Sequence, residues 1–86
     1  MNHLEDTQIV SLFFSRSEGA ISETSQKYGS YLKTIACNLL PSAQDAEEIV
    51  NDVYLAAWNT IPPKRPPVLK YYLSRIVRNL CFKRLD

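Results

Sequence analysis

Hydrophobic residues recur along most of the chain at the three- and four-residue spacing that is typical of amphipathic α-helices. No segment alternates apolar and polar residues with a period of two, so no β-strand is predicted. The pattern predicts an all-α fold, a compact bundle of about four helices with no sheet. The helices are expected at residues 6–15, 20–40, 43–60 and 68–85.

The expected helix ends are marked by residues that start or interrupt helices. Asp6 is placed to cap the first helix, and residues 15–19 are expected to break or kink it because they contain serine and glycine. Pro41 ends the second helix. Ser42 followed by Asp45 resembles a capping box at the start of the third helix.

Each longer helix has a candidate buried stripe. Within the second helix, Gly29 lowers the stability of the helix, which indicates that another part of the chain packs closely against it. The second helix is expected to bury Ile21, Tyr28, Leu32, Ile35 and Leu39. The third is expected to bury Ala46, Ile49, Val50, Val53 and Ala57. The fourth is expected to bury Leu69, Leu73, Ile76 and Leu80.

The segment between the last two helices, residues 61–67, is rich in proline. Four prolines fall within the six residues 62–67, which excludes a regular helix or a central strand there. We therefore expect a stiff, extended connector.

Length and composition limit the class of protein. The chain of 86 residues with 45% apolar content is expected to form one globular domain, residues 1–86. No apolar run is long enough to span a membrane and the first residues do not resemble a secretory leader, so a cytoplasmic location is expected. Cys37 and Cys81 form no metal-ligand motif and are interpreted as buried thiols in a reducing compartment.

Charge is unevenly distributed along the chain, although the net charge is only +1. Residues 1–41, 42–63 and 64–86 carry net charges of −1, −4 and +6. This division favours two surfaces that serve different partners. The alternative is that the acidic and basic helices neutralise each other.

The sequence does not favour an enzyme or a cofactor site. It has no glycine-rich phosphate loop, no nucleophile with an evident base partner and a single histidine. Asp45, Glu48 and Asp52 lack the histidine that follows a glutamate by three residues in di-metal carboxylate sites. We interpret these carboxylates as an exposed helix face, and expect no metal or cofactor.

The basic fourth helix is the stronger candidate for a binding site. Its arginines and lysines can neutralise backbone phosphates. Tyr71, Tyr72 and Phe82 offer rings on which unpaired bases stack, and Asn79 can pair with a base edge. The alternative is that Tyr72 belongs to the core and the arginines are simply solvated.

Two blocks of the sequence resemble region 2 of bacterial sigma-70-type initiation factors, particularly the short extracytoplasmic-function group. Residues 45–58, DAEEIVNDVYLAAW, are similar to the family pattern D-A-E-D-[LI]-V-Q-[ED]-[VT]-[FY]-L-x-[AL]-[WY]. Residues 72–80, YLSRIVRNL, resemble the family's [WY]-L-x-R-I-A-R-N. Residues 9–13 and 28–32 also fit, so the resemblance covers about residues 5–86.

The resemblance implies a non-catalytic domain with two binding surfaces. One helix face would bind the clamp helices of the largest catalytic subunit of RNA polymerase. The next loop and helix would recognise and melt the promoter −10 element, holding the non-template strand with one base flipped into a pocket. The implied polymerase-binding residues are Asp45, Glu48, Asn51 and Asp52. The implied DNA-binding residues are Lys64, Arg65, Tyr71, Tyr72, Arg75, Arg78, Asn79 and Lys83, with the loop of residues 61–68.

The sequence departs from the family pattern in three places. Asn51 stands where glutamine is usual, and the proline-rich loop replaces a shorter loop that contains phenylalanine. The loop sets specificity, so the preferred −10 sequence does not follow from the resemblance. The C-terminal domain that binds the −35 element is absent, so we expect an excised domain or a truncated chain.

Two other functions compete with promoter binding. One is a helical protein-interaction module, such as the part bound by an anti-sigma factor, without DNA binding of its own. Such a factor is also a further partner implied by the family. The other is a general binder of double-stranded DNA, but Pro62 to Pro67 exclude a short helix-turn-helix between the last two helices.

Overall fold

The computed structural model describes residues 3–85, and these residues form an all-α fold. The helices are α1 (Asp6–Phe14), α2 (Gly19–Leu39), α3 (Ala43–Thr60) and α4 (Leu69–Leu85). Each end lies within one residue of its expected position, and no strand occurs among residues 3–85. The predicted fold class is therefore confirmed. None of the described helices is long and apolar enough to cross a bilayer.

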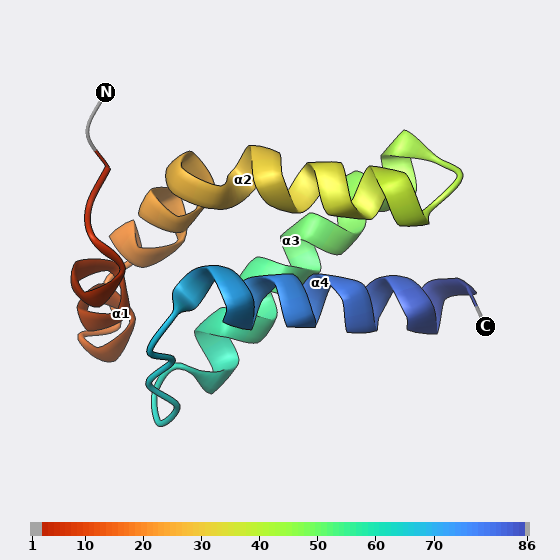
Figure 1. Cartoon of the computed structure of the whole chain (residues 1–86). Helices are drawn as coiled ribbons and strands as arrows, with labels where there is room; N and C mark the ends of the chain where they lie inside the picture. Colours follow the sequence, from red (N-terminus) through yellow and green to blue (C-terminus); the bar gives the residue numbers. More distant parts are fainter. Residues whose placement is uncertain (1–2, 86) are drawn as a thin grey trace.

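Three long helices form the body of the bundle, and α1 closes one end of it (Figure 1). α2 and α4 lie side by side and run in the same direction, while α3 crosses them on its way back. α1 packs against α2. The loop between α3 and α4 lies at the same end of the bundle as α1, so the start of α4 is close to the N-terminal part of the chain.

The expected apolar face of α3 is buried in full. α2 differs in part from the expectation: Leu32 is buried as expected, but the other buried side chains are small, and Ile21, Tyr28, Ile35 and Leu39 are only half-buried. Small side chains let α3 and α4 approach α2 from both sides. The buried residues of α2 are Ala20, Thr24, Leu32 and Ala36. Those of α4 are Leu69, Leu73, Ser74, Val77 and Cys81, with Ile76 and Leu80 at the edge of the core.

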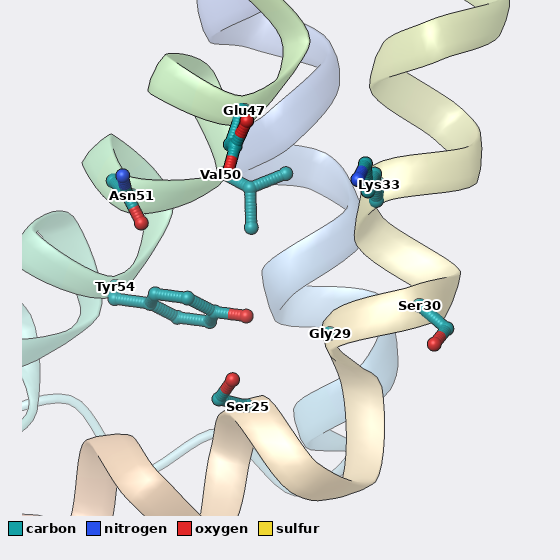
Figure 2. A pocket seen from close by; sticks show the side chains of 8 residues that line it. All are labelled: Ser25, Gly29, Ser30, Lys33, Glu47, Val50, Asn51 and Tyr54. Carbon is teal, nitrogen blue, oxygen red and sulfur yellow. The ribbon is translucent and has the colours of Figure 1, made fainter. Parts of the chain in front are cut away.

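The close packing expected at Gly29 is confirmed. A Cβ atom at this position would lie 3.2 Å from Tyr54 Oη and 3.5 Å from Ser25 Oγ. Figure 2 shows the Tyr54 ring reaching from α3 toward the backbone of Gly29. The glycine therefore sets how closely α2 and α3 approach each other.

The break between α1 and α2 is a turn in which Arg16 adopts the left-handed conformation, with φ of 57°. Glycine usually occupies this position after a helix, because a side chain is strained there. The Arg16 guanidinium compensates: Nη1 donates to the Ile61 carbonyl at 2.8 Å, and the group stacks 3.7 Å from the centre of the Trp58 ring. The turn thus joins α1 to the end of α3.

The residue expected to cap α1 has another role. Glu5 is the N-cap, and its N–H donates to Gln8 Oε1 at 2.9 Å. Asp6 lies in the first turn, where its Oδ1 accepts hydrogen bonds from Tyr28 Oη at 2.6 Å and Lys27 Nζ at 2.8 Å. The prediction failed because a carboxylate next to the cap can bond across to another helix, which sequence alone does not reveal.

These contacts shift the pKa values of Asp6 and Tyr28. Burial raises the pKa of Asp6, but hydrogen bonds from Lys27 and Tyr28 and the Lys27 charge outweigh it, so the pKa lies below its usual value. Burial and the hydrogen bond to Asp6 raise the pKa of Tyr28. The carboxylate is therefore the stable form in the folded chain. Its stabilising effect is present above the usual aspartate pKa and is lost as the pH falls through the folded-state value.

Replacing Asp6 with asparagine is expected to lower the free energy of unfolding by about 1–2 kcal/mol at pH 7, because it removes two charge-assisted hydrogen bonds. The variant should also lose less stability than the wild type as the pH falls below about 4. Urea unfolding at several pH values measures both effects. Asp52→Asn, at an exposed aspartate, is the matched control. Equal stability of Asp6→Asn and the wild type would contradict this role.

The start of α3 follows the expected cap. Ser42 Oγ accepts a hydrogen bond from the Asp45 backbone N–H at 3.3 Å. Ser42 is therefore confirmed as the N-cap of α3.

The proline-rich loop is not the extended connector that was expected. Residues 61–63 form a turn, in which the Lys64 N–H donates to the Thr60 carbonyl at 2.9 Å. Ile61 is fully buried. The buried isoleucine side chain holds the beginning of the loop in the core, and the Ile61 carbonyl accepts a hydrogen bond from Arg16. The loop is therefore held against the bundle at its α3 end.

The two cysteines differ in environment. Cys81 is buried in α4, and burial raises the pKa of its thiol although Arg84 opposes this effect. Cys37 is exposed, so the expectation that both thiols are buried is wrong for this residue. Ala36 faces the core, and the next position along α2 points outward.

Candidate functional site

The outer face of α4 brings together most of the residues predicted to bind DNA. Tyr71, Arg75 and Arg78 recur at spacings of four and three residues, so they lie on one side of the helix. All are exposed, and Tyr71 has 69% of its surface accessible. The opposite side of α4 is buried in the core, which fixes this orientation. Asn79 and Lys83 are exposed farther along the helix.

A surface pocket lies where the proline-rich loop meets α4, and we call it the Tyr71 pocket. Its volume is about 310 Å³. Proline, valine and tyrosine side chains form most of its wall, and an arginine contributes a positive charge. An apolar hollow beside a cation suits a planar, partly polar ligand attached to an anion. The lining residues are Pro66, Pro67, Val68, Tyr71, Tyr72 and Arg75.

Tyr72 is held in place by a contact between helices. Its hydroxyl lies 2.6 Å from Thr60 Oγ1 at the end of α3, and its ring is half-buried against the core. The side chain therefore belongs partly to the core and partly to the wall of the Tyr71 pocket. A fixed ring lowers the entropy cost of binding a ligand to that wall.

The two basic residues of the loop, Lys64 and Arg65, are both exposed. The Arg65 guanidinium stacks 4.0 Å from the centre of the Phe14 ring, so it is turned toward α1. It lines a second pocket of about 270 Å³ with Thr7, Val10, Ser11, Pro66 and Pro67. Arg65 is thus not among the residues that line the Tyr71 pocket, although Pro66 and Pro67 border both pockets.

The exposed side of α3 carries the residues predicted to bind the polymerase. We call Asp45, Glu48 and Asp52 the acidic face. Arg84, near the end of α4, bridges two of them: Nη1 lies 3.2 Å from Asp45 Oδ1, and Nη2 lies 3.5 Å from Glu48 Oε1. Asp52 is exposed and forms no ion pair within residues 3–85. The acidic and basic helices therefore neutralise each other only locally.

Asn51 lies toward α2 and not toward Arg84. It lines an open pocket of about 330 Å³ between α2 and α3, together with Lys33, Glu47 and Tyr54 (Figure 2). The four residues predicted to bind the polymerase are therefore spread across the width of the exposed side of α3. Two are paired with α4, one borders α2, and Asp52 is left without an ion pair in the described part of the chain.

Arg84 was not expected to lie beside the acidic face. A cation in the last turn of a helix is ordinary, because it interacts favourably with the helix dipole. The distance in sequence gave no sign that it would meet α3. Within residues 3–85, no cluster of three or more histidine, cysteine or carboxylate side chains is arranged to hold a metal ion.

The chain matches the model of a known protein family. The family model described as sigma-70 region 2 matches residues 25–86, which is most of the chain and includes α3 and α4. No curated protein and no solved structure matches the chain significantly.

Proposed function

The chain belongs to the sigma-70 region 2 family, and we propose from this premise that it binds the RNA polymerase core and recognises and melts the promoter −10 element. The family as a whole serves promoter recognition in transcription initiation. The proposed function is binding alone, and no covalent bond is made or broken. It would take place in the cytoplasm, where the polymerase and the promoter meet.

The Tyr71 pocket is the observation that carries the DNA half of this proposal. An unpaired base presents a planar ring with polar edges, and its phosphates lie to either side. The apolar wall of the pocket suits the ring, and Arg75 suits a phosphate. Arg78 continues the positive charge one turn along the same face of α4. A strand along this face would thus meet stacking surface first and then cations.

Lys64, Arg65 and Lys83 add positive charge to the surface of the loop and of α4, and Asn79 adds a polar side chain that can pair with a base edge. All four are exposed, and none is in an ion pair within the described residues. The charges of the two lysines and the arginine attract the DNA backbone at a distance and add affinity that does not depend on sequence. Selectivity would come from the pocket and from the loop that forms one side of it.

The acidic face supports the polymerase half of the proposal. Carboxylates on an exposed helix are complementary to a basic partner, and such complementarity speeds association and fixes orientation. Asn51 borders this face on the α2 side and would add a hydrogen bond. On binding, Asp45 and Glu48 would give up their ion pairs with Arg84 and form new ones with cations of the partner. The free-energy cost of breaking the old pairs is small, because exposed ion pairs are weak.

Melting follows from differential affinity. A domain that binds unpaired bases and not the duplex shifts the promoter from the closed to the open state by the difference in binding free energy. The polymerase-bound α3 would hold α4 at the DNA, so the two surfaces act on one complex. The rigid packing of α3 against α4 makes this coupling direct.

A fluorescence titration tests the DNA half. The ligand is a labelled non-template oligonucleotide that carries the −10 element of a promoter used by the polymerase with this chain. A scrambled oligonucleotide of equal length and composition is the control. We expect at least about tenfold tighter binding to the −10 sequence, in the range that one or two stacked bases supply.

The outcome of the titration also distinguishes promoter binding from the competing function. Equal, weak binding of both oligonucleotides would favour the alternative of a protein-interaction module, for example one bound by an anti-sigma factor. The titration is repeated in the presence of polymerase core, because α4 would be oriented on the DNA only in that complex.

A further inference from the structure

Two arginine side chains link the end of α1 to the proline-rich loop, and they reach in opposite directions. From the turn after α1, the Arg16 guanidinium stacks 3.7 Å from the centre of the Trp58 ring, and its Nη1 donates to the Ile61 carbonyl at 2.8 Å. From the loop, the Arg65 guanidinium stacks 4.0 Å from the centre of the Phe14 ring. We call these contacts the arginine clasp. They join two segments that lie at the same end of the bundle (Figure 1).

The arginine clasp holds the loop at two points, and the second adjoins the Tyr71 pocket. Ile61 follows the last residue of α3, and Arg65 directly precedes Pro66 and Pro67, which line the pocket. The same two prolines border the second pocket, whose other wall belongs to α1. The loop side of the Tyr71 pocket therefore lies between α4 and α1, and its position depends on both helices.

Arg16 occupies its place in the turn at a conformational cost. Its φ of 57° lies in the left-handed region, where glycine is free of strain and a residue with a side chain is not. The backbone alone would thus favour glycine at this position. What arginine adds is a guanidinium that contacts Trp58 and the Ile61 carbonyl together. The strain therefore points to a role for the side chain.

Half of the arginine clasp comes from outside the part of the chain that matches the sigma-70 region 2 model. The match covers residues 25–86, so Phe14 and Arg16 precede it. Trp58, Ile61 and Arg65 lie within it. The loop of the matched part is thus held by a segment that the family match does not include.

We propose that Arg16 and Phe14 are positioning residues for −10 recognition, through which α1 sets the selectivity of the Tyr71 pocket. The inference rests on the proposed function of that pocket in binding an unpaired base. Neither residue lines the pocket, so both act through the loop. A loop that is ordered before binding loses less entropy when a base enters. A wall fixed at one distance also fits some bases better than others.

Loss of the arginine clasp should therefore affect selectivity more than general affinity for DNA. Binding of the phosphate backbone depends on the charges of the loop and of α4, and these charges remain when the clasp is removed. Binding of a preferred base depends on the position of the pocket wall. The two contributions respond differently to the same substitution, which makes the inference testable.

Arg16→Gly and Phe14→Leu each remove one half of the arginine clasp. Arg16→Gly also relieves the left-handed strain, so the helices should remain folded. Phe14→Leu removes the ring beneath Arg65 but keeps an apolar side chain against the core. Tyr31→Leu is the matched control, because Lys70 lies 4.7 Å from the centre of this half-buried ring, between α2 and α4.

Hydrogen exchange of the Lys64 amide, measured by NMR, reports on the loop in the absence of DNA. This N–H donates to the Thr60 carbonyl at 2.9 Å in the turn that begins the loop. We expect Arg16→Gly and Phe14→Leu to speed its exchange at least about fivefold, because the turn opens more often when an anchor is lost. Tyr31→Leu should exchange at the wild-type rate.

The second measurement is the ratio of affinities for the −10 and scrambled oligonucleotides, obtained by fluorescence titration of the whole chain. Arg16→Gly and Phe14→Leu should lower this ratio from about tenfold to about twofold, mainly by weakening binding of the −10 sequence. Tyr31→Leu should keep the wild-type ratio. Lys33→Ala, which removes an exposed cation elsewhere as Arg16→Gly does, should keep it too. Thermal unfolding shows whether each variant is folded.

The possible results separate this inference from the proposed function. If the wild type prefers the −10 sequence and both variants keep that preference, α1 does not position the loop, although the proposed function stands. If the variants weaken binding of both oligonucleotides equally, the arginine clasp only stabilises the fold, and the inference is wrong. If the wild type itself shows no preference, the proposed function fails and the inference fails with it.

Discussion

Replacing Asp52 with arginine is expected to abolish binding to the RNA polymerase core while the helical bundle remains folded. Asp52 is exposed and forms no ion pair within the described residues, so the change disturbs no internal contact. An arginine there would face the cations of the partner. Like charges brought together at an interface cost several kcal/mol, which corresponds to a loss of more than about 100-fold in affinity.

Glu23→Arg is the matched control for Asp52→Arg, because it makes the same change in net charge on α2, away from the acidic face. We expect the control to retain most of the affinity for the polymerase core. Binding is measured by competition against the wild-type chain, and thermal unfolding reports the stability of each variant. Normal binding of Asp52→Arg would contradict the assignment of the acidic face to polymerase binding.

The second large effect is expected when arginines of α4 are replaced, and it concerns the affinity for single-stranded DNA. The double change Arg75→Ala and Arg78→Ala should weaken binding to the single-stranded −10 oligonucleotide by roughly 10- to 100-fold at low salt. Two lost phosphate contacts should also lower the slope of log affinity against log salt by about 1.4, or about 0.7 for each contact on a single strand. Both arginines are exposed and in no ion pair among the described residues, so the fold should be unaffected.

Lys33→Ala is the control for the arginine variants, because Lys33 is an exposed cation on α2 that lines a different pocket. It should change neither the affinity for the oligonucleotide nor the slope. A double arginine variant with an unchanged slope would mean that Arg75 and Arg78 are merely solvated. A steep loss for Lys33→Ala would mean that the DNA follows α2, and would contradict the proposed path along α4.

The sequence was sufficient for the secondary structure and for the division of charge. Helical spacing of apolar residues and strong boundary residues such as Ser42 place each helix end within one residue of the observed position. The resemblance to sigma-70 region 2 was also accessible from two sequence blocks, and the family match confirms it. These features are local, because each depends on residues within a few helical turns of one another.

The orientation of exposed residues was partly accessible as well. The outer face of α4 follows from its spacing, since a helix that buries Leu69 and Leu73 must expose Tyr71 and Arg75. The same reasoning failed for Cys37, which an apolar pattern placed in the core. Spacing gives the direction of a side chain around its own helix, but not how far a neighbouring helix covers it.

Contacts between distant residues were decided only by the tertiary structure. Asp6 was expected to cap a helix but bonds to Lys27 and Tyr28, and Arg84 meets Asp45 across 39 positions of sequence. The proline-rich loop was expected to be extended, but burial of Ile61 and its bond with Arg16 fold it against the bundle.

The same holds for the surfaces on which function is proposed. The Tyr71 pocket forms because the loop returns to α4. The sequence by itself determined the helices, their boundaries and their charges, because those follow from short-range periodicity. Which charges are neutralised and where hollows form depends on how the helices pack, and packing is a property of the whole chain.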